Sequence, residues 1–155
     1  MTYGGQAYPA DGSAAIIVAE PGKARELSRD ARIRVRILGF GQARAALACM
    51  PEAPLPAARR ALAQAGLDIG AMNAVKMHNP FAVNDILFCR EAGIAPERVN
   101  NFGCSLIWGH PQAPTGARAI IELIEELALR GGGYGLFTGC AAGDSAMAVV
   151  LRVGD

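Results

Sequence analysis

Two separated groups of residues in this chain have the types that thiol-dependent acyl-transfer chemistry needs. The first is Gly109-His110-Pro111, which places a histidine on a turn between a glycine and a proline. The second is Cys140, further along the chain. Histidine titrates near neutral pH and can take a proton from a thiol, and the resulting thiolate is a strong nucleophile. Spacing alone leaves open whether His110 is such a base or a histidine that packs in a turn.

Cys140 and His78 both stand at the predicted ends of strands. Cys140 lies in a glycine-rich turn, and ligand sites in α/β sheets lie at the carboxyl ends of strands. The small residues around Cys140 leave backbone N–H groups free to bind an oxyanion. His78 could donate a hydrogen bond to a substrate carbonyl. Each has a structural alternative: a turn cysteine beside flexible glycines, and a histidine whose hydrogen bonds serve only the fold.

Length and composition predict a single globular domain. The chain has 155 residues, of which 52% are hydrophobic and 19% are charged, so it can bury a real core. A net charge of +1 argues against nucleic-acid binding, which needs a basic patch. No stretch reaches the ~20 apolar residues of a membrane span, and the first residues lack the pattern of a secretory signal. We expect a cytoplasmic protein that binds neither nucleic acid nor membrane.

The cysteines and histidines do not have the spacing of a metal site. The four cysteines are scattered and form no Cys-x-x-Cys pair: Cys49, Cys89, Cys104 and Cys140. The two histidines are not at helical ligand spacing. We therefore expect no structural metal, and we expect Cys49 and Cys89 to be buried small side chains in a reducing compartment.

Strand and helix patterns alternate along the chain. Five segments have the pattern of strands: 14–19, 32–38, 72–77, 134–138 and 146–153. Four have the pattern of helices: 21–28, 54–65, 82–92 and 116–130. Gly66, Gly93 and the run 131–133 are helix stops, and Thr115 is the expected N-cap of the last helix. The alternation predicts an α/β fold, a five-stranded mixed sheet flanked by helices and ending in an antiparallel hairpin.

Three segments together resemble motifs of the thiolase family. One segment resembles the histidine motif of that family. It covers residues 101–111, which begin Asn101-Phe102-Gly103 and end Gly109-His110-Pro111, and it continues to Gly116-Ala117-Arg118. Tyr134-Gly135-Leu136, leading to Cys140 and Gly143, is similar to the second cysteine motif. His78-Asn79-Pro80-Phe81-Ala82 lies where many thiolases have Asn-Glu-Ala-Phe-Ala, and its histidine resembles the sterol-carrier-protein type. The order of the motifs implies a thiolase-like C-terminal domain.

The resemblance implies a role for each matched residue. His110 would activate a nucleophilic cysteine and line an oxyanion hole, and His78 would support that hole in place of the family's asparagine. Cys140 would move a proton to or from the α-carbon of the second acyl group. The residues implied in substrate binding are Gly143, Trp108, Phe81 and Gly109. Two positions depart from the family pattern: Ala142 stands where a glycine is usual, and Trp108 is bulkier than the common residue.

The resemblance also implies an incomplete enzyme. Residues 11–15 resemble a stretch near the end of the family's N-terminal domain. We therefore assign 1–29, with the first strand and helix, to that domain, and 30–155 to the C-terminal domain. The family's nucleophilic cysteine comes from the N-terminal domain, and neither Cys49 nor Cys104 replaces it. We expect a second chain or a missing segment to carry that domain, in an oligomer, and we expect this chain alone to be inactive.

The implied activity is that of an acetyl-CoA acetyltransferase-type acyltransferase. It would carry out Claisen condensation or thiolysis of a 3-ketoacyl-CoA, with the coenzyme A thioester as substrate and no further cofactor. One alternative is a non-catalytic thiolase-like module that binds acyl-CoA or scaffolds a partner. Another is a relative of β-ketoacyl synthases, in which His78 and His110 would face the nucleophile and Cys140 would have no role. A nucleophile supplied by another chain discriminates the first two readings.

Overall fold

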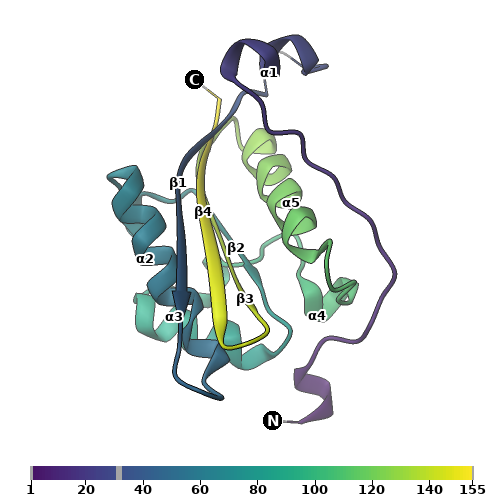
Figure 1. Cartoon of the computed structure of the whole chain (residues 1–155), viewed down its shortest axis with the longest axis vertical. Coiled ribbons are helices and arrows are strands. Elements are labelled where there is room, and N and C mark those ends of the chain that lie inside the picture. Colours follow the sequence, from purple (N-terminus) through teal and green to yellow (C-terminus); the bar gives the residue numbers. More distant parts are fainter. Residues whose placement is uncertain (1, 31–32, 155) are drawn as a thin grey trace.

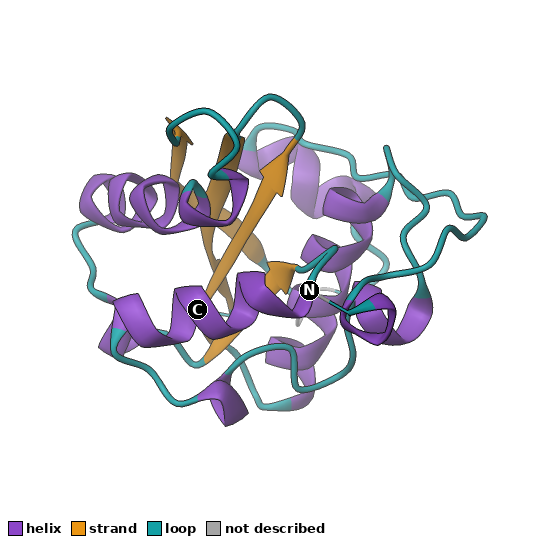
Figure 2. Ribbon diagram, turned by 90° about the horizontal axis from the view of Figure 1, so that it is seen from below, coloured by secondary structure: helices purple, strands orange, loops and turns teal. Residues whose placement is uncertain are grey.

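The chain folds around one mixed sheet. The computed structural model describes residues 2–30 and 33–154, and Figures 1 and 2 show helices on both faces of the sheet. The strand order is β1 (Val35–Arg44), β4 (Ser145–Val153), β3 (Gly133–Ala141) and β2 (Ala74–His78). β4 is antiparallel to both β1 and β3, and β3 is parallel to β2. The α/β class and the final hairpin are confirmed, but the sheet has four strands, so the predicted number of five is wrong.

Apart from α4 (Ser105–Trp108), which was not predicted, the described helices lie close to their predicted positions. They are α1 (Pro21–Leu27), α2 (Pro54–Ala65), α3 (Ala82–Ala92), α4 (Ser105–Trp108) and α5 (Thr115–Leu129). Short 3-10 helices stand at Tyr3–Gly5, Met50–Glu52, Ile69–Ala71 and Pro96–Arg98. Gly66 and Gly93 end α2 and α3 in the left-handed conformation, each with φ of 67°. These glycine stops confirm two helix ends that composition alone predicts.

Helix α2 packs very close to the sheet because the side chains on both contacting surfaces are small. Gly39 and Gly41 of β1 lie under Ala57 and Ala61 of α2, and a Cβ at either glycine would collide with the helix backbone. The larger core cluster lies on this face, between the sheet, α2 and α3. Its largest fully buried side chains are Val75, Met77, Phe88, Leu136 and Val150. This face is therefore sealed by the chain itself.

Helix α5 covers only part of the opposite face. Leu123 and Leu127 of α5 are fully buried against Phe137 of β3 and Leu151 of β4. The helix packs mainly on β2 and β3. No described helix covers the part of this face that β1 and the start of β4 form. Its apolar side chains are exposed: Val35, Ile37, Phe40 and Met147. We call these four residues the open apolar face.

The predicted strand at 14–19 is wrong. Residues 14–19 are in extended backbone without strand pairing, and Ile17 and Val18 are 78% and 73% exposed rather than buried. Figure 1 shows this segment running along the outer side of α5, away from the sheet. A strand needs a neighbour for its backbone groups, and no strand of the described sheet lies beside this segment. The assignment of 1–29 to a separate domain stays a prediction.

Other element boundaries differ from the predicted ones at residues that matter for the site. β1 runs from Val35 to Arg44 instead of 32–38, and part of the predicted start lies outside the described residues. Thr115 is the first residue of α5 and not its cap, since the N-cap is Pro114. Cys140 lies inside β3 and not in a turn, because the hairpin keeps its pairing out to Ala141 and Ser145. All four cysteines are free thiols, with Cys89 buried as expected and Cys49 half-buried.

Candidate functional site

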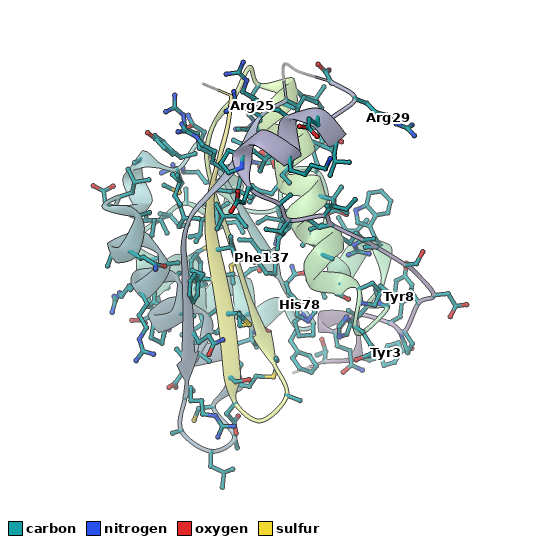
Figure 3. All side chains as sticks on the ribbon, turned by 45° about the horizontal axis from the view of Figure 1, so that its top comes forward. Tyr3, Tyr8, Arg25, Arg29, His78 and Phe137 are labelled. Atoms are coloured by element: carbon teal, nitrogen blue, oxygen red, sulfur yellow. The ribbon has the colours of Figure 1, made fainter. Side chains whose placement is uncertain are left out.

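The two histidines meet at one end of the sheet. His78 is the last residue of β2, and His110 lies on the loop between α4 and α5. Their ring centroids are 4.5 Å apart, with the ring planes tilted by 40°. His78 is buried and His110 is half-buried. Figure 3 shows Tyr3 and Tyr8 of the N-terminal segment on the side of the molecule where His78 lies. Two imidazoles in contact are a pair of groups that can donate and accept protons at one place.

Strand pairing positions His78. His78 pairs in register with Gly139 of the parallel neighbour β3. A Cβ at Gly139 would lie 2.8 Å from the Cβ of His78, closer than nonbonded carbons approach. The absence of a side chain at Gly139 therefore gives the histidine its place at the sheet end. The requirement for glycine at this point is steric, because this residue has no positive φ.

The N-terminal segment holds the loop of His110. The backbone N–H of His110 donates to the carbonyl of Tyr8 at 2.8 Å, and the N–H of Ala7 donates to the carbonyl of Pro80 at 2.8 Å. Gly109 has φ of 85°, and a Cβ there would lie 2.6 Å from the Cβ of Ala10. Gly109, predicted to bind substrate, thus packs against the N-terminal segment. The segment ties the two histidine-bearing loops together.

Each histidine is held by a hydroxyl through Nδ1. His78 Nδ1 lies 3.1 Å from Ser105 Oγ, and His110 Nδ1 lies 2.8 Å from Thr115 Oγ1. The predicted cap residue Thr115 therefore orients a histidine. Because Nδ1 is engaged in both rings, Nε2 is the nitrogen left to meet a ligand in each. Both hydroxyl-bearing residues are buried, so the hydrogen bonds are shielded from water.

Both histidines are neutral at pH 7. Burial lowers the pKa of His78 to about 4, and the neighbouring charges of His110 and Arg118 act in the same direction. Burial, followed by the charge of Arg118, also lowers the pKa of His110. A neutral imidazole can accept a proton from a thiol or donate one hydrogen bond from its protonated nitrogen. The pair therefore suits base catalysis and carbonyl polarisation.

Cys140 does not contact the histidine pair. Its side chain points to the α2–α3 side of the sheet, where Asn84 Nδ2 donates to its Sγ at 3.4 Å, whereas His78 lies on the α5 side. Burial raises the pKa of the Cys140 thiol, although its backbone hydrogen bond and Asn84 oppose that shift. The backbone is nevertheless close, because Cys140 follows the Gly139 that pairs with His78. The structure brings the two histidines together and leaves the sulfur behind the sheet.

Residues that sequence reasoning missed support the pair. Asn79 Oδ1 accepts from the backbone N–H of Ser105 at 3.1 Å, and Asn79 Nδ2 donates to Asp85 Oδ2 at 2.5 Å. Asn84 is fully buried against Cys140. The sequence does contain a signal for these supporting residues. Polar residues stand directly after His78 and inside an apolar stretch at 104–108. A polar residue in a segment predicted to be buried requires a partner.

The other predicted substrate-binding residues lie around the pair. Trp108 is 54% exposed, and its indole packs over Gly103, where a Cβ would collide with the ring. Phe81 is the N-cap residue of α3, forms an isolated bridge with Gln6 and is half-buried. Gly143 sits in the β3–β4 turn with φ of 78°. Their contact with a substrate stays a prediction.

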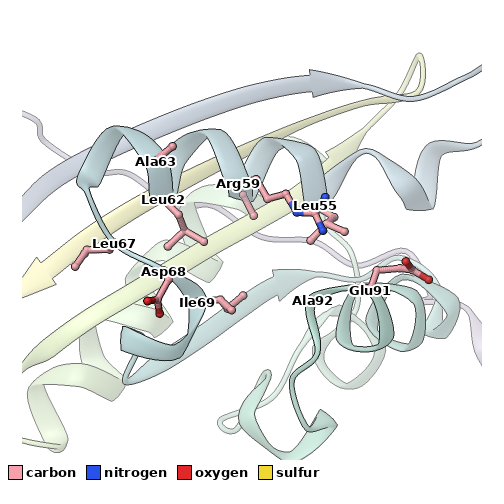
Figure 4. A pocket seen from close by; sticks show the side chains of 10 residues that line it. Leu55, Arg59, Leu62, Ala63, Leu67, Asp68, Ile69, Glu91 and Ala92 are labelled. Atoms are coloured by element: carbon pink, nitrogen blue, oxygen red, sulfur yellow. The ribbon is translucent and has the colours of Figure 1, made fainter.

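A hollow in the surface lies away from the histidines. It has a volume of about 290 Å³, and Figure 4 shows its lining. Leu55, Leu62 and Ile69 form part of the wall, with Arg59 and Glu91 at the rim. These residues lie on and around α2 and α3, so the hollow contains none of the residues predicted for catalysis. We assign it no role in the chemistry.

Within residues 2–30 and 33–154, no group of three or more histidine, cysteine, aspartate or glutamate side chains could hold a metal ion. No helix in the part of the chain that the structure describes is long and apolar enough to cross a membrane.

Comparisons with known proteins point to one family. Residues 31–153 match the model of the thiolase C-terminal domain. The chain is 37% identical to a 3-ketoacyl-CoA thiolase of Erwinia tasmaniensis, over 92% of this chain and 36% of the relative. It is 32% identical to a probable acetyl-CoA acetyltransferase of Mycobacterium leprae, over 98% of this chain and 38% of the relative.

A solved structure supports the same assignment. The Acat5 thiolase of Ascaris suum, solved in complex with coenzyme A, superposes with a TM-score of 0.72 at 28% identity, over 77% of this chain and 31% of that one. The chain thus spans less than two fifths of the length of these relatives. The family match extends over both histidines, Cys140 and every strand of the sheet. The chain belongs to the thiolase family and corresponds to the C-terminal domain of its members.

Proposed function

We propose that this chain is the C-terminal half of a thiolase-type acyl-CoA acyltransferase that acts on 3-ketoacyl-CoA, by thiolysis or Claisen condensation. The observation that carries the proposal is the pair of neutral imidazoles at the end of β2, with each Nδ1 engaged and each Nε2 left for a ligand. The proposal includes a coenzyme A thioester as substrate and no further cofactor. A cytoplasmic location and an oligomeric state belong to it as expectations.

The nucleophile comes from an N-terminal half. In thiolysis, His110 takes the proton of that cysteine, and the thiolate attacks C3 of the 3-ketoacyl-CoA. His78 and the backbone donors of the site stabilise the negative charge on the carbonyl oxygen. The C2–C3 bond then breaks to give an enzyme thioester and the enolate of acetyl-CoA, which takes a proton from Cys140. A second coenzyme A gives its thiol proton to the Cys140 thiolate, and its sulfur displaces the acyl group from the nucleophilic cysteine. That cysteine takes its proton back from His110, so both groups return to their starting states.

Cys140 can fill this role only if its sulfur leaves Asn84. In the described structure Asn84 holds the sulfur on the α2–α3 side of the sheet. A rotation about the Cα–Cβ bond frees the sulfur from Asn84. It leaves Cβ on the α2–α3 side of the sheet, so the proposal also requires the substrate to reach the thiol around the end of β3. The raised pKa of the thiol suits a proton donor, because the group keeps its proton at pH 7 until the enolate requires it.

The open apolar face supports the part of the proposal that concerns a partner chain. Strands lie about 4.8 Å apart and a helix is about 10 Å across, so one helix covers about two strands. The two helices α2 and α3 cover one face, but on the other face α5 covers mainly β2 and β3. Ile37 and Phe40, at 55% and 58% exposure, lie beyond it. A further helix, carried by an N-terminal half, fits this place.

The exposed segment 14–19 supports the same partner. Its residues Ile16, Ile17 and Val18 are apolar, extended and exposed. An extended apolar segment with free backbone groups pairs readily with another strand. We propose that it joins the sheet of the N-terminal half. The lone chain leaves it unpaired because that sheet is not part of this chain.

One observation favours a second candidate function. Because the Cys140 sulfur faces away from the histidines and is buried, the chain could bind acyl-CoA or scaffold a partner without catalysis. In that case the histidine pair would orient a thioester carbonyl only. The two candidates differ in turnover and agree in binding, so one experiment separates them.

The test is thiolysis of acetoacetyl-CoA by this chain co-expressed with an N-terminal thiolase domain. We expect turnover only when both halves are present, and we expect His110→Ala to lower kcat/KM by about 10²- to 10⁴-fold. Leu129→Ala, at a residue that is 75% exposed, is the control and should leave the rate unchanged. A folded complex that binds acyl-CoA without turnover would establish the non-catalytic module instead.

A further inference from the structure

The hydroxyl of Ser105 contacts the His78 ring at Nδ1, on the side of the ring away from Nε2. Ser105 is 2% exposed, and its Oγ lies 3.1 Å from Nδ1 of His78. Among the contacts of the described residues, this is the hydrogen bond that its hydroxyl makes. The other elements packed around the ring add His110 and the guanidinium of Arg118. The Ser105 hydroxyl is the hydrogen-bond partner that the described contacts give to this ring, so it can decide which ring nitrogen carries the proton.

A buried amide fixes the place of that hydroxyl. Asn79 follows His78 directly, is fully buried, and accepts from the backbone N–H of Ser105 at 3.1 Å. Its Nδ2 donates to Asp85 Oδ2 at 2.5 Å, and Asn100 Nδ2 approaches the same oxygen at 3.4 Å. The amide therefore has one orientation, with its oxygen toward Ser105. This link holds the start of α4 against the end of β2, so hydroxyl and ring cannot separate without breaking it.

The direction of the hydrogen bond between Ser105 and His78 follows from which buried proton would lack an acceptor. If Nδ1–H donated to Ser105, the hydroxyl proton would be buried without an acceptor, which costs free energy. If Ser105 donates, its proton has an acceptor, and the ring proton resides on Nε2. Nε2 is the nitrogen that faces away from Ser105. Donation by Ser105 is thus the arrangement that pairs the buried hydroxyl proton and turns the ring proton toward the site, where a ligand can accept it.

We propose that Ser105 is a positioning residue that donates to Nδ1 of His78 and so holds this histidine as the neutral tautomer protonated on Nε2. The inference rests on the proposed function in one respect: the Nε2–H then donates to the substrate carbonyl oxygen. It assigns different work to the two rings. His78 is a hydrogen-bond donor, and His110 is left as the ring that takes the proton of the nucleophile.

The test measures the tautomer of His78 by ¹⁵N NMR on the full chain. A protonated and an unprotonated ring nitrogen have separate ¹⁵N shifts, so the wild-type spectrum alone is decisive. We expect Nε2 of His78 to be protonated and Nδ1 to be a hydrogen-bond acceptor. A spectrum with the proton on Nδ1 overturns the proposal, whatever the variants do.

Two matched variants locate the effect. Ser105→Ala removes the hydroxyl next to His78, and we expect a mixture of the two tautomers at that ring with the His110 shifts retained. Thr115→Val removes the hydroxyl next to His110, and we expect the His78 tautomer to be retained. If Ser105→Ala leaves the His78 tautomer unchanged, Ser105 does not set it.

The assembled enzyme gives a separate readout. With an N-terminal domain present, Ser105→Ala should lower kcat by about 10- to 100-fold with little change in KM, as expected for a group that orients a catalytic side chain. If the complex shows no turnover while His78 carries its proton on Nε2, the proposed function fails and the role of Ser105 stands. If the complex shows turnover while His78 carries its proton on Nδ1, the proposed function stands and the role of Ser105 fails.

Discussion

His78 and His110 lie with ring centroids 4.5 Å apart, although one ends a strand and the other sits on the loop before α5. At this distance a charge on one ring opposes a charge on the other. Arg118 lies close enough to act on both in the same direction. Burial is the main cause that lowers the pKa of each ring, and these charges add to it. The pair therefore stays neutral where an isolated histidine would begin to titrate. This relationship underlies both the proposed chemistry and the pH dependence of the fold.

The stability of the chain should fall as the pH drops through the range of His78. The pKa of His78 is lowered from 6.5 to about 4 in the folded state, so below 6.5 the unfolded chain binds the proton first. The stabilisation is fully present above pH 6.5 and is lost as the pH falls toward 4, and it amounts to on the order of 3 kcal/mol. Urea unfolding at a series of pH values measures it, and His78→Gln should flatten the curve between these limits.

Gly139→Ala should displace His78. The new Cβ would lie 2.8 Å from the Cβ of His78, and we expect a loss of about 1–3 kcal/mol in the free energy of unfolding. Gly116→Ala is the matched control, because its Cβ would meet only Phe137 at 3.8 Å. On a helix that change should stabilise by up to about 1 kcal/mol. Equal effects of the two variants would show that Gly139 is not selected by the histidine.

Lys76→Met should be strongly destabilising. Lys76 is fully buried in β2, where its Nζ lies 2.9 Å from Glu122 and donates to the carbonyl of Gly103 at 2.7 Å. Lys76→Met removes one of the two cations beside Glu122, which also pairs with Arg118 at 3.4 Å, and it leaves the carbonyl of Gly103 without its donor. We expect a loss of about 3 kcal/mol. The double variant Lys76→Met with Glu122→Gln should recover more than half of this loss in urea unfolding.

An exposed ion pair is the control for that experiment. Lys23 and Glu26 lie 2.7 Å apart on α1, with side chains 62% and 66% exposed. Lys23→Met should give a change too small to resolve, since such pairs contribute little in water. Losses at Lys76 and Glu122 that simply add in the double variant would show that the buried pair is not coupled.

Phe40→Asp should weaken the binding of an N-terminal half while leaving this chain folded. Phe40 belongs to the open apolar face and is 58% exposed, so the change should cost the isolated chain no more than about 1 kcal/mol. A charge buried in the interface should raise Kd at least tenfold, roughly 1.4 kcal/mol or more. Calorimetric titration measures both variants, and Leu47→Asp, at a position 91% exposed, should bind normally. Unchanged binding by Phe40→Asp would place the interface elsewhere.

Local signals predicted much of the secondary structure. The ends of α2 and α3 were visible because Gly66 and Gly93 supply the left-handed conformation that ends a helix. The strand at 14–19 was predicted from its apolar composition and is absent, because strand formation depends on a neighbour that composition does not reveal. The helix ends are thus local properties of the chain, whereas a strand at 14–19 would require a neighbouring strand, which the described residues do not supply.

For the candidate site, the sequence by itself determined which residue types stand in which order: His78, His110 and Cys140 in a pattern that belongs to one family. Only the tertiary structure decided that His78 and His110 touch, that Ser105 lies behind one of them, and that the Cys140 sulfur faces away. The physical reason is strand geometry. Successive side chains of a strand point to opposite faces, so pairing and register, which arise from contacts distant in the sequence, determine which groups share a site.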